Sequence, residues 1–272
     1  MRILDRPLEG ITIAIPESRF GTEFADMFQR LGAQVHLCPL TTETVLADRT
    51  STQTFVDLAI SGGLDLIIFM TGVGTNLILD EAEAIGKRQA FLESLADVRI
   101  LSRGSKSTAA LRKANVRIDI IPASATTEGV IEALRDHDLS GKRIAVQLYG
   151  TPNPTLCSAL ERRGATVIPV SVYTYSPASD LSEIELLIQD LIRGPINIIV
   201  FTSAPQVRAL FETAANLDLI AGLRNSLQIR TQVASIGEVT TRALEQYGVR
   251  PHIVPEQPKM GPMVKAICTT RF

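Results

Sequence analysis

The sequence predicts an α/β protein with parallel sheets, divided into two domains. Its 272 residues are many for one domain and comfortable for two, since domains usually hold roughly 100–150 residues. Short apolar runs alternate with helical segments, and parallel strands need a helix to connect them. The chain also contains an internal repeat, whose two copies begin near residues 10 and 141.

Each copy opens with a short apolar strand that is followed by a helix. The strands are residues 10–15 (GITIAI) and 141–148 (GKRIAVQL). In the first helix apolar side chains recur at i, i+4 and i+7, and the second helix keeps that spacing with a polar last member. These positions are Phe24, Phe28 and Leu31 in the first copy and Leu156, Leu160 and Arg163 in the second.

A Gly-Ala-x-Val segment then opens an extended run in each copy. The runs are residues 32–41 and 164–175, and both continue past the length of an ordinary core strand, about five or six residues. We therefore interpret them as the two crossings of the chain between its domains.

Two further pairs of strands complete the repeat. Residues 64–71 match 196–203, and the near-continuous apolar character of both predicts strands covered on both faces. Residues 100–107 match 233–240, and in both copies a proline stands 18 positions after the glycine of that segment. The equal spacing supports duplication of a whole α/β unit.

Composition excludes several classes of function. Hydrophobic residues make up 45% and charged residues 21%, with a net charge of −2 and a pI near 6.0, so no basic field favours nucleic acid or an anionic membrane. No apolar run reaches the roughly 18 residues of a membrane span, and residues 1–7 lack a signal-peptide core, which predicts a cytoplasmic protein. The odd, scattered Cys38, Cys157 and Cys268 argue against disulfides or zinc, and the three histidines share no metal-ligand spacing.

Polar residues follow the strands at their carboxyl ends, where open α/β sheets bind ligands. The segment 102–107 combines Gly104 with two cations, Arg103 and Lys106, and hydroxyls that include Ser102 and Ser107. A helix N-terminus at this point would suit an anion such as a carboxylate. The alternative is a glycine that merely permits a turn, with both cations solvated.

Other strand ends carry similar candidates. Thr71, Gly72 and Gly74 follow one buried strand, and Thr202 and Ser203 follow its counterpart. Taken singly, these residues are as well explained as turn formers. A lone Gly-x-Gly is a poor cofactor signal, and we expect no metal or organic cofactor. Gln147, Tyr149 and Thr240 are the remaining candidates, the last also a helix-start hydroxyl.

Several separated segments together resemble the uroporphyrinogen-III synthases, a family of tetrapyrrole-pathway enzymes. The resemblance covers about residues 8–267. The sequence departs from the family at the end of the first strand, where many members have Thr-Arg-Pro and this chain has Ala14-Ile15-Pro16. Whether Arg19 replaces the arginine missing at Ile15 stays open. The segments are residues 71–74 (TGVG), 102–109 (SRGSKSTA), 143–150 (RIAVQLYG), 170–173 (VSVY) and 201–205 (FTSAP).

The resemblance implies two flavodoxin-like lobes joined by a two-stranded antiparallel hinge, with the substrate in a cleft between them. Lobe one would take residues 1–39 and 172–272, and lobe two the inserted residues 40–171. The hinge strands would be about 34–42 and 167–176. The repeat alone would have placed the cut near residue 138.

The resemblance also implies a reaction, in which linear hydroxymethylbilane closes to uroporphyrinogen III and water with inversion of ring D. Tyr173 matches the family's tyrosine and would assist departure of the hydroxide. An unperturbed tyrosine titrates near 10 and is a hydroxyl donor at neutral pH. Without the resemblance, Tyr173 reads as a strand aromatic covering the hinge. The expected substrate-binding residues are Thr71, Gly72, Gly74, Ser102, Arg103, Gly104, Lys106, Ser107, Gln147, Tyr149, Thr202, Ser203 and Thr240.

The partner expected from the resemblance is the small molecule hydroxymethylbilane, with a transient hand-over from the upstream deaminase. We expect a monomer that binds neither nucleic acid nor membrane. Two alternatives remain open, a two-lobed ligand-sensing module without catalysis and a flavodoxin-like flavin protein.

Overall fold

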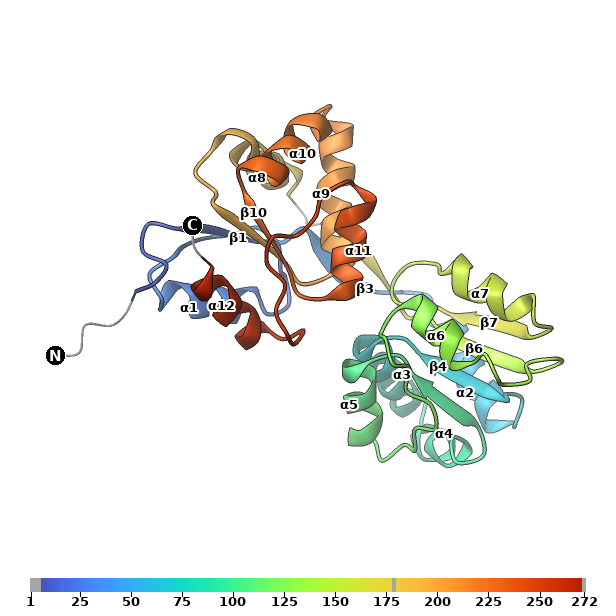
Figure 1. The fold of residues 1–272 in the computed structure, drawn as a ribbon. Helices are drawn as coiled ribbons and strands as arrows, with labels where there is room; N and C mark the ends of the chain where they lie inside the picture. Colours follow the sequence, from blue (N-terminus) through green and yellow to red (C-terminus); the bar gives the residue numbers. More distant parts are fainter. Residues whose placement is uncertain (1–5, 178–179, 271–272) are drawn as a thin grey trace. The chain divides into compact units, whose positions relative to one another are not determined.

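The structure, a computed structural model, describes residues 6–177 and 180–270 (Figure 1). It contains two compact units. Unit 1 consists of Met1–Thr42 and Ser176–Phe272, and unit 2 of Glu43–Tyr175. Each unit is built on a four-stranded parallel sheet with helices packed around it. No helix in the described ranges is long and apolar enough to cross a membrane.

Unit 2 has the strand order β5-β4-β6-β7. Its strands are β4 (Leu66–Phe69), β5 (Arg99–Ser102), β6 (Arg143–Gln147) and β7 (Thr166–Val170). Its helices are α2 (Thr50–Ile60), α3 (Gly72–Ala84), α4 (Arg88–Ser94), α5 (Ser105–Lys113), α6 (Thr127–Ala133) and α7 (Pro154–Glu161).

Unit 1 has the strand order β10-β9-β1-β2. Its strands are β1 (Thr12–Ile15), β2 (Gln34–Leu37), β9 (Ile198–Phe201) and β10 (Gln232–Ser235). Its helices are α1 (Gly21–Gln29), α8 (Leu181–Arg193), α9 (Ala204–Asn216), α10 (Ile220–Ile229), α11 (Glu238–Gln246) and α12 (Met260–Thr269).

The predicted repeat corresponds to equivalent positions in the two sheets. β4 matches β9, β5 matches β10, and β6 and β7 match β1 and β2. Beyond β5 and β10, isolated parallel bridges join Leu101 to Ile120 and Ala234 to Ile253. Each bridge lies two residues before a proline of the repeat, which explains the equal 18-residue spacing in the two copies.

Each sheet is covered on both faces. All residues of β4 and β9 are buried, as their continuous apolar sequences predict. Ile67 and Phe69 of β4 pack into one hydrophobic cluster, and Leu66 and Ile68 pack into another. Since successive strand residues point to opposite faces, these clusters are the two cores that flank the sheet.

The expected hinge strands need a correction. Residues 34–37 and 166–170 do not belong to a hinge: they form β2 and β7, which pair in parallel with β1 and β6. A separate two-stranded antiparallel sheet is formed instead by β3 (Thr41–Val45) and β8 (Tyr173–Pro177), where the chain passes from one unit to the other. Each long extended run is therefore two strands, and Pro39, which has no amide hydrogen for a ladder, stands in the first interruption.

The two crossings start in the same way. Gly32 and Gly164 turn the chain out of α1 and α7 with φ of +97° and +83°, a region that favours glycine. The cuts between the units fall within β3 and β8, slightly later in the chain than the expected cuts after residues 39 and 171.

Candidate functional site

The carboxyl edge of the unit 2 sheet collects most of the predicted site residues. Thr71 follows β4, Arg103 follows β5, Tyr149 lies two residues beyond β6, and Tyr173 begins β8. In parallel strands these ends meet at one edge, so residues far apart in sequence become neighbours. Thr202, Ser203 and Thr240 lie in unit 1 instead.

The Tyr173 hydroxyl is held at the start of α3. Thr71 caps this helix, because its Oγ1 accepts a hydrogen bond from the Gly74 amide at 3.0 Å. Tyr173 donates its hydroxyl to the same Oγ1 at 3.3 Å. The tyrosine side chain is 2% exposed, so its position is defined by packing as well as by this bond.

Burial raises the pKa of the Tyr173 hydroxyl, while hydrogen bonds with Thr71 and Tyr175 oppose this shift in part. A tyrosinate at this position would be desolvated, which disfavours the charged form. A hydroxyl with a raised pKa stays protonated at neutral pH and can donate a proton. The site therefore keeps Tyr173 in its acid form.

Tyr175 and Gly150 belong to the site although sequence reasoning missed both. The Tyr175 ring meets the Tyr173 ring edge to face, with centroids 5.6 Å apart. Gly150 has φ of +80°, and a Cβ there would lie 2.7 Å from Tyr175 and 2.8 Å from Tyr173. The Tyr-x-Tyr spacing was the available signal, since residues two apart share a face of a strand.

Arg103 supplies positive charge at this edge. Its guanidinium lies over the Tyr149 ring, 5.2 Å from the centroid. Its Nε is buried and unpaired, because it has no hydrogen-bond partner among the described residues. Burial lowers the pKa of Arg103, yet an arginine stays protonated at neutral pH. A desolvated cation with an unsatisfied donor suits an anionic group of a ligand.

Most of the other predicted residues at this edge are packed inside the unit, and Lys106 is the exception. Ser102 and Ser107 are buried, and their hydroxyl oxygens are 2.8 Å apart. A Cβ at Gly72 would lie 2.7 Å from the carbonyl oxygen of Lys106, so the starts of α3 and α5 touch there. Gly104 caps α5, and the Lys106 side chain is exposed.

Gln147 is fully buried and bonded within the protein. Its Oε1 accepts hydrogen bonds from the amides of Met70 at 3.1 Å and Thr71 at 3.0 Å. Gly74 leaves room for this carboxamide, because a Cβ at that position would collide with it. Gln147 therefore holds the Thr71 loop, a role that sequence reasoning did not assign.

Unit 1 has its own polar network at the corresponding edge. Thr202 donates its hydroxyl to the Glu17 carboxylate, and Gln206 donates to the same oxygen at 3.1 Å. Sequence reasoning missed both Glu17 and Gln206. Ser203 caps α9, and Thr240 is 3% exposed in the first turn of α11.

Arg19 does not occupy the place of an arginine at Ile15. Ile15 is fully buried in the core of unit 1. The Arg19 side chain is exposed, with its guanidinium 5.2 Å from the centroid of the exposed Phe20 ring.

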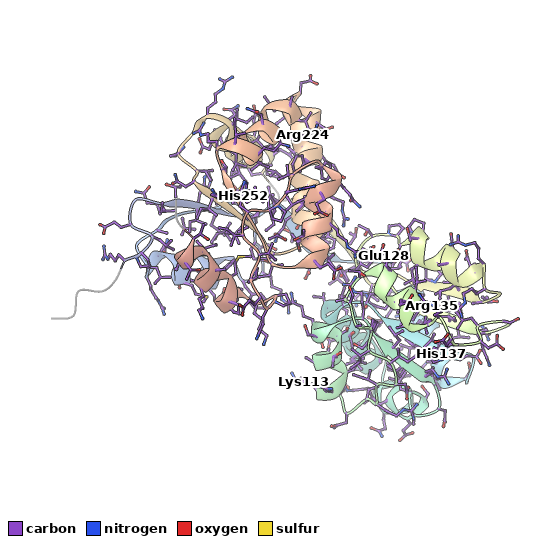
Figure 2. All side chains as sticks on the ribbon, in the orientation of Figure 1. Lys113, Glu128, Arg135, His137, Arg224 and His252 are labelled. Carbon is purple, nitrogen blue, oxygen red and sulfur yellow. The ribbon has the colours of Figure 1, made fainter. Side chains whose placement is uncertain are left out.

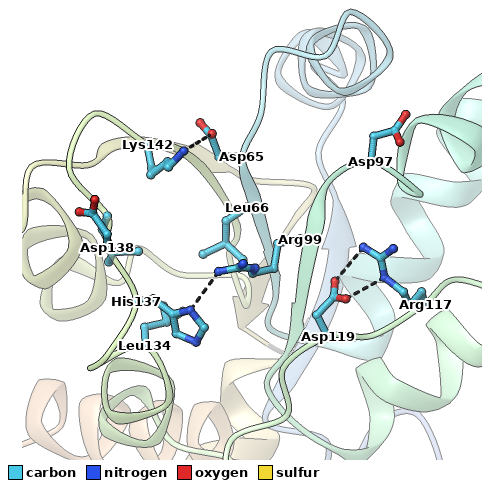
Figure 3. Close-up of a pocket in the computed structure, with 11 residues that line it drawn as sticks. Asp65, Leu66, Asp97, Arg99, Arg117, Asp119, Leu134, His137, Asp138 and Lys142 are labelled. Carbon is cyan, nitrogen blue, oxygen red and sulfur yellow. Dashed lines mark hydrogen bonds and ion pairs between the residues drawn. The ribbon is translucent and has the colours of Figure 1, made fainter.

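A cavity of about 460 Å³ lies at the opposite, amino edge of the unit 2 sheet (Figure 3). Its charges largely satisfy one another: Lys142 pairs with Asp65 at 3.0 Å and Arg117 with Asp119 at 2.7 Å. Arg99 donates to the His137 ring at 2.9 Å. Because these charged groups already bind one another, they are less available to a ligand than the unpaired Nε of Arg103 at the carboxyl edge.

The histidines are engaged in local contacts. His252 of unit 1 accepts a hydrogen bond from the Val233 amide at 3.0 Å, and His137 lies in unit 2 (Figure 2). His36 is 3.8 Å from a carboxylate oxygen of Asp190. The described residues contain no group of three or more side chains that could hold a metal ion.

Two parallel α/β units of equivalent topology, connected by the chain through a two-stranded sheet, match the two-lobed fold of uroporphyrinogen III synthases. Residues 22–265 match the family described as uroporphyrinogen-III synthase HemD. The chain belongs to the uroporphyrinogen-III synthase family, which acts on a small tetrapyrrole substrate.

The chain is similar to one uncharacterized protein and to solved structures of this family. The Bacillus subtilis (strain 168) protein YjjA is 31% identical over 96% of both chains and is described as uncharacterized. A crystal structure of a mutant uroporphyrinogen III synthase from Thermus thermophilus is 30% identical, with a TM-score of 0.80 over 94% of this chain and 97% of that one. The Helicobacter pylori 26695 uroporphyrinogen-III synthetase is 14% identical with a TM-score of 0.53, over 96% and 100%, and shares the fold.

Proposed function

We propose that this protein is a uroporphyrinogen-III synthase, a lyase that closes hydroxymethylbilane to uroporphyrinogen III with inversion of ring D. The observation that carries the proposal is the buried Tyr173 hydroxyl held by Thr71, at the edge of unit 2 that also carries the unpaired Nε of Arg103. Membership of the family supplies the reaction, and these residues supply a proton and a site for an anion.

Loss of the terminal hydroxyl is the step that needs an acid. The Tyr173 hydroxyl donates its proton to the departing hydroxide, which leaves as water. The substituted carbon of ring D attacks the methylene carbon of the resulting azafulvenium cation and forms a spiro intermediate. The bond from that ring carbon to its original methylene bridge then breaks, and the free alpha carbon of ring D bonds to the released methylene, so that the ring is inverted. The ring proton released when the macrocycle regains its pyrroles restores the tyrosine.

The flexible, eight-carboxylate substrate must be held in one shape, which is positioning catalysis. Arg103 and Lys106 attract its carboxylates, and the Tyr149 ring holds the Arg103 guanidinium in place. Six further residues shape the loops that carry Thr71 and Arg103: Ser102, Gly104, Ser107, Gly72, Gly74 and Gln147. Three residues shape the strand-end loops of unit 1 in the same way: Thr202, Ser203 and Thr240.

The proposal extends to the setting of the reaction. The protein works without a cofactor, as a monomer in the cytoplasm, and receives the bilane from the upstream deaminase. The steps above need only the proton of Tyr173 and groups that bind carboxylates.

The test is incubation with freshly made hydroxymethylbilane, followed by oxidation and separation of the porphyrin isomers. We expect an excess of isomer III over the spontaneous mixture. A ligand-sensing module would leave the isomer ratio at its spontaneous value, and this result would refute the proposal.

A further inference from the structure

In each unit, a glutamine side chain accepts hydrogen bonds from two backbone amides that follow a central strand. The glutamine belongs to a strand in unit 2 and to a helix in unit 1. In unit 2, Gln147 of β6 accepts from the amides of Met70 and Thr71 at 3.1 and 3.0 Å. In unit 1, Gln206 of α9 accepts from the amides of Thr202 and Ser203 at 2.9 and 3.2 Å. The sheet registers align Phe69 with Phe201, so each glutamine binds the same two amides.

The nitrogen ends of the two carboxamides also bind equivalent residues. Gln147 donates its Nε2 to the carbonyl oxygen of Leu148, and Gln206 donates to the Glu17 carboxylate at 3.1 Å. Ile144 pairs with Leu66 in unit 2, and Ile13 pairs with Ile198 at the equivalent place in unit 1. Leu148 and Glu17 lie the same number of residues after Ile144 and Ile13, so they are equivalent. In both units, then, one carboxamide connects two neighbouring strand ends.

The position that holds the glutamine in one unit holds a different residue in the other unit, and these other residues explain why the glutamine comes from different elements. Position 74 in unit 2 is equivalent to position 206 in unit 1, and a Cβ at Gly74 would collide with the Gln147 carboxamide. Unit 1 has Pro16 at the position equivalent to Gln147, and a proline side chain cannot supply a carboxamide. The carboxamide thus comes from one position or the other, and both amides stay satisfied.

We propose that Gln147 and Gln206 are equivalent positioning residues, which hold the strand-end loops of the two units for the reaction. Gln147 acts through Thr71, whose Oγ1 receives the Tyr173 hydroxyl. Gln206 acts through Thr202 and Ser203. The proposal rests on the proposed function, because it assigns these residues to the same reaction.

The equivalence predicts that the carboxamide of unit 2 can be moved to the position used in unit 1. Gln147→Ala leaves two buried amides without an acceptor, and Gly74→Gln alone collides with Gln147. The double variant places one glutamine where unit 1 has it. We expect each single variant to lower kcat about tenfold or more, with KM changed less than about threefold, and the double variant to recover most of the loss.

A readout besides activity separates positioning from mere stability. The Thr71 hydroxyl can donate to the ionised Tyr173 oxygen, and this bond to the charged form lowers the pKa of Tyr173. Loss of the Thr71 position should therefore move the ultraviolet titration of this tyrosine to higher pH. The Tyr173 component is obtained by subtracting the titration of each variant combined with Tyr173→Phe. Gln147→Ala should show the shift, and the double variant should lose it.

Two results would overturn the proposal: a double variant no better than the worse single variant, or a Tyr173 titration that is the same in all four proteins. If a single variant fails to fold, recovery of a cooperative thermal transition in the double variant decides the equivalence instead. If the wild type itself gives only the spontaneous isomer ratio, the proposed function fails, while the titration still tests how Gln147 positions Thr71.

Discussion

Tyr173 combines the properties that the proposed acid needs. It is buried, its hydroxyl is held by Thr71, and its pKa, raised by burial, leaves the proton on the hydroxyl at neutral pH. The same Thr71 oxygen also caps α3. The proton donor is thus tied to the start of a helix.

Replacing Tyr173 with phenylalanine should therefore slow the reaction far more than it destabilises the fold. We expect kcat to fall by roughly 10²-fold, at the low end of general acid effects. The free energy of unfolding should change by about 1 kcal/mol, because one long hydrogen bond is lost and the ring remains.

Tyr247→Phe is the matched control, since Tyr247 stacks on Phe211 in unit 1, with ring centroids 4.4 Å apart. It should leave the isomer ratio and kcat unchanged. An unchanged rate in Tyr173→Phe would remove this hydroxyl from the mechanism.

Stability should fall at alkaline pH because Tyr173 and Tyr175 both have raised pKa values, caused first by burial. Above about pH 10 the unfolded chain loses these protons while the folded protein retains them. The folded state then binds more protons, so the free energy of unfolding decreases as pH rises through this window.

Urea unfolding at pH 8, 10 and 11 measures this dependence. Tyr175→Phe should reduce the slope between pH 10 and 11 relative to wild type. The buried Cys38 thiol, with its pKa raised to about 11, contributes with the same sign and remains in both proteins. Equal slopes in wild type and Tyr175→Phe would contradict the assignment of this loss to the tyrosine.

Among the elements, the starts of α3 and α5 form the framework of the candidate site. Both helices begin shortly after a strand, β4 or β5, and they touch where Gly72 faces the carbonyl oxygen of Lys106. Their N-terminal amides point to the same carboxyl edge. This close approach depends on the missing side chain of Gly72.

Gly72→Ala should force these helices apart. The new Cβ would lie 2.7 Å from a backbone oxygen, which cannot move as freely as a side-chain end. We expect a loss of about 1–3 kcal/mol in the free energy of unfolding, as for other overpacked sites.

Gly261→Ala in α12 is the control, because nothing lies within 4 Å of a Cβ there. Alanine in an open helical position should stabilise the protein by up to about 1 kcal/mol. Denaturant unfolding of both variants gives the comparison. Equal stability in Gly72→Ala and wild type would show that the backbone relaxes at this contact.

In the molecule as a whole, the two units differ in the number of chain segments that form them. Unit 2 is one continuous segment with a hydrophobic core on each face of its sheet, whereas unit 1 is assembled from two segments. A continuous segment with its own cores meets the requirements of an independent domain.

A fragment of residues 41–177, which retains β3 and β8, should therefore fold by itself. We expect a cooperative urea transition followed by circular dichroism. The complementary protein, with residue 42 joined to residue 176 by a short Gly-Ser linker, tests unit 1 in the same way. A fragment without a cooperative transition would mean that unit 2 depends on the rest of the chain.

Local sequence patterns were sufficient to predict the α/β class, the repeat and the strand ends that carry polar residues. These features depend on periodicity and on the burial of continuous apolar strands such as β4 and β9, which are visible without tertiary contacts. Arg103 was found in this way, because it follows a strand of the repeat. Tyr173 needed the family resemblance as well, since a tyrosine in an extended run is common in any sheet.

Contacts between distant segments were needed to tell the sheet strands β2 and β7 from the separate pair β3 and β8, because both kinds have the same local conformation and differ in their partners. The same contacts turn Gln147 and Ser107 inward and join Glu17 to Gln206. In each case the surroundings of a side chain, and not its chemical type, set what it does, and those surroundings come from parts of the chain far away in sequence.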